Sequence, residues 1–300
     1  MQELKDIIFK EMVNQHFDCI AVGVVDFDSA SFESLEFKEG EGFLETESFY
    51  DLASLTKPMT LASSWLLDPE LFSDEMLLLL NHRGNLPAWG LLDRKTWKEQ
   101  ILSYPISPAE TDLYSDFSAL RTMLEIEKRT GKPLYETCSK AWDSEVCHWT
   151  DLKAPELSPP TGFRDGHTVR GEVHDPNAWV IKDKISHAGL FGTVSGLCRT
   201  LLNLEKMTGM RKRIKNEFDS HDPNRRFIKG WDRVLEPGNS IAGNKASELT
   251  FGHLGFTGTS IWMDLKTSKG VVLLSNGTKN YWYDKGGLNA IRRQIHDKVW

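Results

Sequence analysis

Cysteine is scarce in this 300-residue chain, which has only four thiols and no Cys-x-x-Cys pair. Four cysteines are too few for a disulfide scaffold in a chain of this size. We therefore expect a reducing compartment and free thiols at Cys19, Cys138, Cys147 and Cys198.

Long apolar runs are also missing, since the densest, 76–80 and 18–25, are far shorter than the roughly 20 residues of a membrane-spanning helix. The first seventeen residues have the pattern of an amphipathic helix with interspersed acids, which differs from a signal peptide. We expect no membrane insertion and a cytoplasmic location. A processed form of an exported protein stays open.

Positive charge is in the minority, with 36 Lys and Arg against 43 Asp and Glu and a net charge of -7. The basic residues gather only in two short clusters, 211–213 and 225–226. This distribution argues against nucleic acid as the main partner. With 40% hydrophobic residues and no internal repeat, the chain is long enough for one large core or two lobes that share a cleft.

Strand patterns lie near both ends of the chain. The first half-dozen elements expected are a helix over 1–17, strands over 19–26 and 31–38, and helices over 54–67, 74–80 and 94–102. Further helices are expected over 117–129, 134–142, 190–207 and 286–300, and strands over 227–234, 248–254, 259–265 and 271–275. This order predicts one antiparallel sheet lobe built from 1–53 and 186–300, with a mainly helical lobe inserted over 54–185.

The sequence Ser54-Leu55-Thr56-Lys57 stands where an extended segment gives way to an apolar, helix-prone run. If Ser54 opens a helix, Lys57 lies on the same face, and its amine can take the serine proton or stabilise the alkoxide. The positive end of the helix dipole adds to this effect. The same serine also fits a simple helix N-cap, so companion motifs must decide its role.

Two such companions follow in the chain. Tyr114-Ser115-Asp116 precedes an expected helix, and His253-Leu254-Gly255 lies on a late expected strand. In this order the three motifs resemble those of the penicillin-recognising serine hydrolases, which comprise class C β-lactamases, D,D-carboxypeptidases, D-aminopeptidases and related esterases. Segments 81–87, 171–175 and 187–191 resemble further parts of the class C-like branch.

The resemblance implies an α+β fold of the D,D-peptidase and β-lactamase type. Such a fold has an antiparallel sheet flanked by terminal helices, an all-helical lobe, and an active site in the cleft between them. No cofactor is implied, and the partner is a small-molecule or peptide substrate. The oligomeric state stays open.

Residue roles follow from the resemblance. Ser54 would be the acylated nucleophile, with Lys57 and Tyr114 sharing its proton and Asp116 holding Lys57. Backbone N–H groups of Ser54 and Phe256 would form the oxyanion hole, and the small Gly255 would let that strand approach the substrate closely. His253 would face the cleft and contact the carboxylate or acyl chain of the substrate.

Three departures from the family pattern concern the companions. Asp116 stands where the second motif usually has asparagine, and its charge should favour the ammonium form of Lys57. His253 replaces the common lysine, so a hold on a carboxylate should weaken above neutral pH if the histidine titrates near its ordinary pKa of about 6.5. Leu254 lacks the usual hydroxyl. The segment between the first two motifs is also short.

Two further patterns in the sequence could indicate a ligand site. Histidines 167, 174 and 187 with acids 165 and 175 match no spacing of metal ligands, so we expect no metal and a loop-fixing role for His174 and Asp175. The glycines of 252–258 do not precede a helix in a βαβ unit, which argues against nucleotide binding. The remaining alternative is a weak or inactive family member that acts as a ligand-binding or protein-interaction module.

Overall fold

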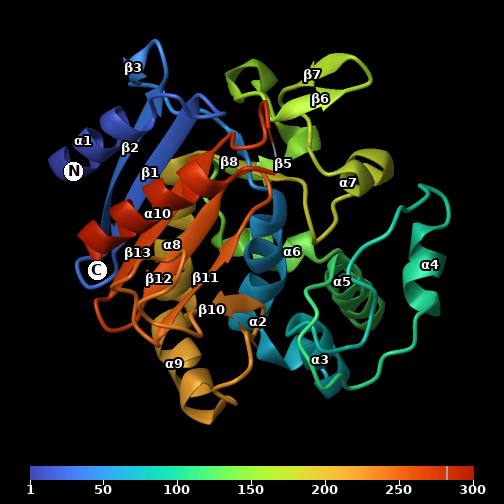
Figure 1. The fold of residues 1–300 in the computed structure, drawn as a ribbon. Helices are drawn as coiled ribbons and strands as arrows, with labels where there is room; N and C mark the ends of the chain where they lie inside the picture. Colours follow the sequence, from blue (N-terminus) through green and yellow to red (C-terminus); the bar gives the residue numbers. More distant parts are fainter. Residues whose placement is uncertain (282) are drawn as a thin grey trace.

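The computed structural model describes residues 1–281 and 283–300, and an eight-stranded antiparallel sheet forms its centre (Figure 1). The strand order is β3-β2-β1-β13-β12-β11-β10-β9, so strands from the two ends of the chain meet where β1 pairs with β13. The bounds are β1 Cys19–Asp26, β2 Ser31–Lys38, β3 Gly42–Phe43, β9 Phe227–Ile228, β10 Trp231–Arg233, β11 Thr250–Leu254, β12 Ser260–Asp264 and β13 Lys269–Ser275.

Helices cover both faces of this sheet. The terminal helices α1 (Gln2–Glu11) and α10 (Gly286–Val299) pack on one face, and α8 (Val194–Thr208) packs on the other (Figure 1). Because side chains alternate along a strand, Ile20 and Val22 of β1 join the core under α1 and α10, while Ala21 joins the core on the α8 side. The expected α+β class, with a sheet flanked by terminal helices, is confirmed.

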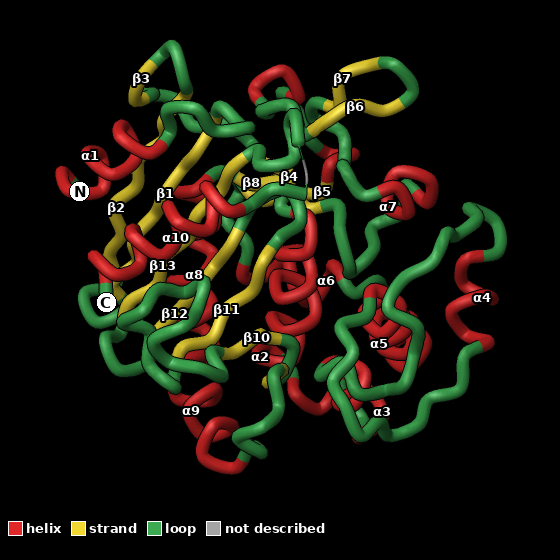
Figure 2. The backbone as a smooth tube through the Cα atoms, in the orientation of Figure 1, coloured by secondary structure: helices red, strands yellow, loops and turns green. Residues whose placement is uncertain are grey.

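The remaining helices and loops lie to one side of the sheet (Figure 2). These helices are α2 Ser63–Leu67, α3 Asp74–Leu80, α4 Trp97–Ser103, α5 Asp116–Thr130, α6 Tyr135–Cys138 and α7 Pro176–Ile181, and α9 (Met210–Ser220) follows α8. A small sheet in the order β4-β8-β5 consists of Tyr50–Asp51, Leu190–Gly192 and Val146–His148, and a hairpin joins β6 (Gly162–Arg164) to β7 (His167–Val169).

The helix expected from residue 190 is wrong at its start. Residues 190–192 form β8, and α8 begins only after Thr193, whose Oγ1 accepts the N–H of Gly196 at 2.9 Å. An apolar run of this length fits a strand and a helix equally well, so hydrophobic pattern alone does not place the boundary. The threonine cap fixes it.

The single strand expected over 227–234 is instead the hairpin of β9 and β10. Its turn is formed by Lys229 and Gly230, both with positive φ angles of 48° and 85°. Two such residues are typical of the tight turns that match the twist of paired strands. Three further differences concern helices: α1 ends at Glu11, 134–142 divides into α6 and a short 3-10 turn, and α9 has no counterpart among the expected elements.

The contact between β1 and α8 is close enough to test. A Cβ atom at Gly23 would lie 2.4 Å from Sγ of Cys198, so Gly23→Ala should lower the free energy of unfolding by about 1–3 kcal/mol. Urea denaturation measures this loss. In a variant that also carries Cys198→Ala the sulfur is gone, so the double change should cost less than the sum of the two single changes. Strict additivity would contradict this packing.

Candidate active site

The chain turns sharply just before Ser54. The buried Asp51 carboxylate accepts the N–H of Ala53 at 2.8 Å and that of His174 at 2.6 Å. Ala53 has a φ of 46°, a strained conformation for a residue with a side chain, and such strain is common beside functional groups. A continuous helical stretch begins here as a 3-10 turn, passes through a π-helical turn at Pro58–Ala62 and ends as α2. Ser54 therefore stands at a helix N-terminus, as expected.

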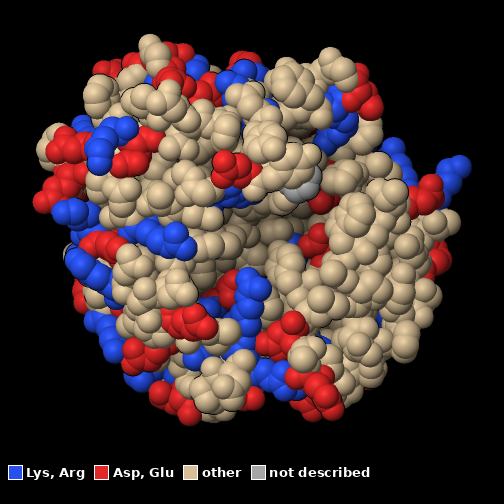
Figure 3. Space-filling model, in the orientation of Figure 1, with Lys and Arg blue, Asp and Glu red and all other residues tan. Residues whose placement is uncertain are grey.

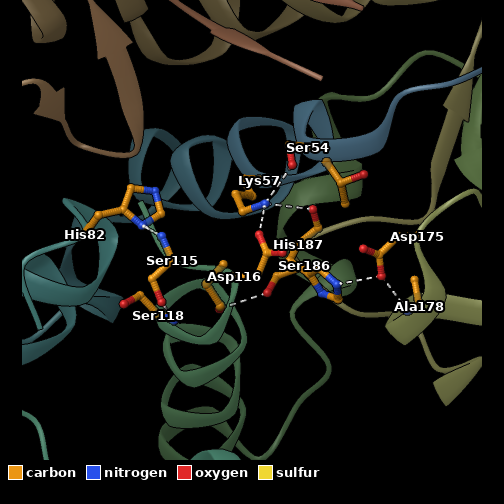
Figure 4. A network of polar contacts seen from close by, with 12 residues as sticks. Ser54, Lys57, His82, Ser115, Asp116, Ser118, Asp175, Ala178, Ser186 and His187 are labelled. Carbon is orange, nitrogen blue, oxygen red and sulfur yellow. Dashed lines mark hydrogen bonds and ion pairs between the residues drawn. The ribbon is translucent and has the colours of Figure 1, made fainter. Parts of the chain in front are cut away.

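The Lys57 amine lies at the centre of the site and is almost wholly buried. It donates to Ser54 Oγ at 2.9 Å and to the backbone carbonyl of His187 at 3.1 Å, and its ion pair with Asp116 Oδ1 measures 2.6 Å (Figure 4). These contacts use all three hydrogens of an ammonium group. Burial disfavours the charge, but Asp116 outweighs that cost and raises the pKa of Lys57 above its ordinary value, in the direction expected from the sequence.

Tyr114 lies beside this amine. Lys57 Nζ is 4.9 Å from the centre of its ring, and the phenol interacts with both Lys57 and Ser54. Burial raises the pKa of Tyr114, the Lys57 ammonium lowers it in part, and Asp116 raises it again, so the balance is a raised pKa. Both Lys57 and Tyr114 therefore hold their protons in the resting site at neutral pH.

Ser115 points away from Lys57 and has a structural role (Figure 4). Its hydroxyl caps α5 by accepting the N–H of Ser118 at 2.9 Å and donates to the carbonyl of Pro87 at 2.6 Å. Its own N–H is donated to Nδ1 of the buried His82 at 3.1 Å. The side chains directed at Lys57 are thus those of Tyr114 and Asp116, the first and last residues of the second motif.

The turn that follows the third motif is hydrogen-bonded to the segment before Ser54. The hydroxyl of Thr257 donates to Asp51 O at 2.7 Å, and that of Thr259 donates to Leu52 O at 3.0 Å. Gly255 and Phe256 follow β11 in the turn and are not on the strand, which corrects the expectation. A Cβ at Gly255 would lie 2.0 Å from Thr259 Oγ1 and 2.6 Å from Leu52 O, so the glycine permits close packing on the segment before Ser54.

His253 differs from the expectation in its charge. His253 is 97% buried, and the centre of its ring lies 5.8 Å from that of the Tyr114 ring. Burial, together with the nearby Lys57 charge, lowers the pKa of His253 to about 3. Its Nδ1 lies 2.8 Å from the carbonyl of Leu254, which only accepts, so Nδ1 carries the hydrogen. The expected loss of charge near pH 6.5 is therefore wrong, because this imidazole is neutral throughout the ordinary pH range.

An acidic side of the site consists of Asp175 with Asp116. The Asp175 carboxylate caps α7 by accepting the N–H of Ala178 at 2.8 Å, and it pairs with His187 Nε2 at 3.0 Å. Burial alone would raise the pKa of Asp175, but the pairing with His187 outweighs it and lowers the pKa to about 2. Asp116, Asp175 and His187 each place one polar atom within 4.8 Å of the others, although Lys57 and the α7 cap already engage both carboxylates.

Two cavities meet at Ser54, Tyr114 and Phe256. The first, of about 400 Å³, is mainly apolar, with Trp89 and Phe256 in its walls and Asp116 and Asp175 at one end. The second, of about 350 Å³, extends over His253 toward α10. Figure 3 shows a hollow at the centre of this face, between the sheet side and the helical side.

The second cavity contains charged residues that sequence reasoning missed. Arg226 pairs with Asp232 through contacts of 3.0 and 2.6 Å, whereas Arg292 is 98% buried and donates only to Thr259 O and Asn289 Oδ1 within the described residues. Burial lowers the pKa of Arg292 to about 9. One signal was visible: this arginine falls on the apolar stripe of the last helix, between Leu288 and Ile295.

The neutral state of His253 is measurable without knowing the function. In ring-nitrogen NMR spectra of the labelled protein, the His253 resonance should keep the shifts of the Nδ1–H tautomer from pH 8 down to pH 5, because protonation of its buried ring begins only near pH 3. His253→Gln identifies that resonance by removing it. A midpoint near pH 6.5 for this histidine would contradict the burial described above.

Comparisons with known proteins concern the family and the fold of this chain. A family model described as Beta-lactamase matches residues 76–294, a range that begins after Ser54. N-acetylmuramyl-L-alanine amidase of Bacillus subtilis is 30% identical over 201 residues, which cover 55% of this chain and 44% of the amidase. A putative D-alanyl-D-alanine carboxypeptidase of Escherichia coli is 29% identical over 246 residues, or 66% of this chain and 56% of the relative. The chain thus spans about half the length of these curated relatives.

The fold is similar to that of a solved class C β-lactamase from Rhodobacter sphaeroides, with a TM-score of 0.66, 13% sequence identity, and coverage of 99% of this chain and 98% of the other. At this identity the likeness concerns the fold alone. None of the helices that the structure describes has the length and apolar character needed to cross a bilayer. Because the family model matches most of its length, the chain belongs to the Beta-lactamase family and has the β-lactamase and transpeptidase-like fold.

Proposed function

We propose that the protein is a serine hydrolase that forms an acyl-enzyme on Ser54 and cleaves an amide or ester, such as a D-amino-acid peptide, a small ester or a β-lactam. The observation that carries this proposal is the 2.9 Å contact between Lys57 Nζ and Ser54 Oγ at the junction of two cavities. The names of the two curated relatives, an amidase and a carboxypeptidase, support amide cleavage.

The first step is attack of Ser54 Oγ on the carbonyl carbon. The serine proton passes to the Lys57–Tyr114 pair, which must first have released one proton, and the pair returns it to the leaving nitrogen or oxygen. Water then attacks the acyl-enzyme by the same route and frees Ser54. Ser54 and Phe256 line both cavities, and their backbone N–H groups are the proposed donors to the developing oxyanion.

A carboxylate on the substrate fits the second cavity. Arg292 is a buried cation without an acidic partner among the described residues, and an uncompensated buried charge is costly. A substrate carboxylate in this cavity would offset that cost. The proposed substrates therefore have an anionic group on the side of the scissile bond that faces α10.

The second candidate function is a ligand-binding member with little turnover. The observation that favours it is that Lys57 and Tyr114 both hold their protons at neutral pH, which leaves the resting site without a ready base. Both candidates bind a ligand in the same cleft. They differ in whether a covalent bond to Ser54 forms.

Loss of the Ser54 hydroxyl should abolish covalent labelling. Ser54→Ala protein incubated with a fluorophosphonate or a fluorescent penicillin should show no adduct by intact-mass measurement, because the phosphonyl or acyl bond is made to that oxygen. Ser103→Ala removes an exposed hydroxyl on α4 and should label like the unchanged protein. Thermal melting checks that both variants fold. An undiminished adduct on folded Ser54→Ala protein would show that Ser54 is not the residue that is labelled.

Asp116→Asn should move the acidic limb of the kcat/KM profile to lower pH by about one unit or more. The Asp116 charge raises the pKa of Lys57 and that of Tyr114, so its removal lets the pair release a proton at lower pH, whichever member loses it. Rates of ester hydrolysis from pH 5 to 10 measure the shift. Asp183→Asn, an exposed carboxylate outside the site, is the matched control. An unmoved limb would mean that Asp116 does not govern the base.

A further inference from the structure

Lys285 reaches the active-site cleft from an element that carries none of the three motifs. It precedes α10 as the N-cap residue, and its half-buried side chain lines the same cavity of about 350 Å³ as Ser54 and His253. Its amine donates to the backbone carbonyl of Phe256 and lies 4.5 Å from the centre of the Phe256 ring. The ammonium is thus held beside the turn that follows the third motif.

The other basic side chains of this cavity are paired, neutral or held deeper in the fold. Arg226 is neutralised by its two contacts with Asp232, and His253 is a neutral imidazole. Arg292 is held by Thr259 and Asn289 deeper in the fold. Within residues 1–281 and 283–300, Lys285 forms no ion pair, and its one backbone contact leaves two of its three N–H groups for a ligand.

We propose that Lys285 binds the substrate carboxylate and supplies, from the start of the last helix, the cation that the third motif lacks at His253. This inference rests on the proposed function, in that the substrate carries a carboxylate in the second cavity. The Lys285 amine is the group that the carboxylate contacts directly, and the Arg292 guanidinium adds positive potential from deeper in the fold. Since Lys285 also holds the Phe256 carbonyl, carboxylate binding is coupled to the backbone of the proposed oxyanion donor.

The assignment has a consequence for pH. Burial and the neighbouring Arg292 charge lower the pKa of Lys285 to about 8. The amine is therefore protonated well below pH 8, and it loses its positive charge as the pH rises through this value. Binding of a carboxylate should weaken over the same range. The other titratable or charged groups that line the cavity are Tyr114, Arg226, Asp232, His253 and Arg292.

The test uses binding alone, in a Ser54→Ala background that prevents turnover. Isothermal titration calorimetry compares N-acetyl-D-alanyl-D-alanine with its C-terminal amide, at pH 6.5 and at pH 9.5. At pH 6.5 the carboxylate ligand should bind about tenfold tighter than the amide, and Lys285→Met should remove this preference. Lys285→Arg should retain it at both pH values, whereas the lysine protein should lose most of it at pH 9.5.

Several results would overturn the assignment. These are equal affinity for the two ligands, an undiminished preference in Lys285→Met, or a similar loss for both ligands, which would indicate that the lysine only supports the Phe256 turn. Failure to bind either ligand at millimolar concentration would overturn it as well. Because this measurement involves no acylation, its outcome is separate from that of the Ser54 labelling experiment.

Discussion

The site depends on one buried ion pair, between Lys57 and Asp116. An ammonium group that is almost wholly removed from water is stable only when its charge and all of its hydrogens are compensated. Its three partners come from separate parts of the chain: the Ser54 turn, the first residue of α5, and the backbone at His187. The pair therefore fixes the position of the helical side of the molecule relative to Ser54, and removal of either member would leave an uncompensated charge.

The sheet side is tied to the same turn by different chemistry. Two threonine hydroxyls after β11 donate to the carbonyls of Asp51 and Leu52, and Gly255 allows the two segments to touch. The carboxylate of Asp51 then holds the strained turn at Ala53 and the backbone of His174. Polar contacts on both sides of Ser54 thus restrict its position, which is the preorganisation that acyl transfer needs.

Much of the fold follows from patterns that sequence alone contains. The alternation of apolar residues in β1 and β13 specifies two packed faces, and the stripe on the last helix specifies a partner for one of them. The start of α8 and the hairpin at Lys229 depend on a single cap and on positive φ angles, which periodicity does not report. Such details come from tertiary pairing, as with β8 between its two neighbours.

The site, like the fold, has features that the sequence predicts and features that only the tertiary structure shows. The resemblance of the three motifs to a known family predicted that Ser54, Lys57, Tyr114 and Asp116 lie together, and the structure brings them together where two helices begin. The charge of His253 was not predictable, since burial and not residue type sets its pKa. Lys285 was missed for another reason: the pairing of β1 with β13 brings the last helix onto the sheet, and no local pattern shows that the residue before this helix shares a cavity with Ser54.

The departures from the family pattern act together on the electrostatics of the cleft. Asp116, in place of the usual asparagine, adds a negative charge beside Lys57. The neutral His253, in place of the common lysine, removes a positive charge. Both differences make the centre of the site more negative. Lys285 and Arg292 offset this on the α10 side, while Asp175 adds a carboxylate on the opposite side of Ser54. Because the charges are separated across Ser54 and the cleft walls have low polarity, the resulting field would orient the proposed anionic substrate group toward α10.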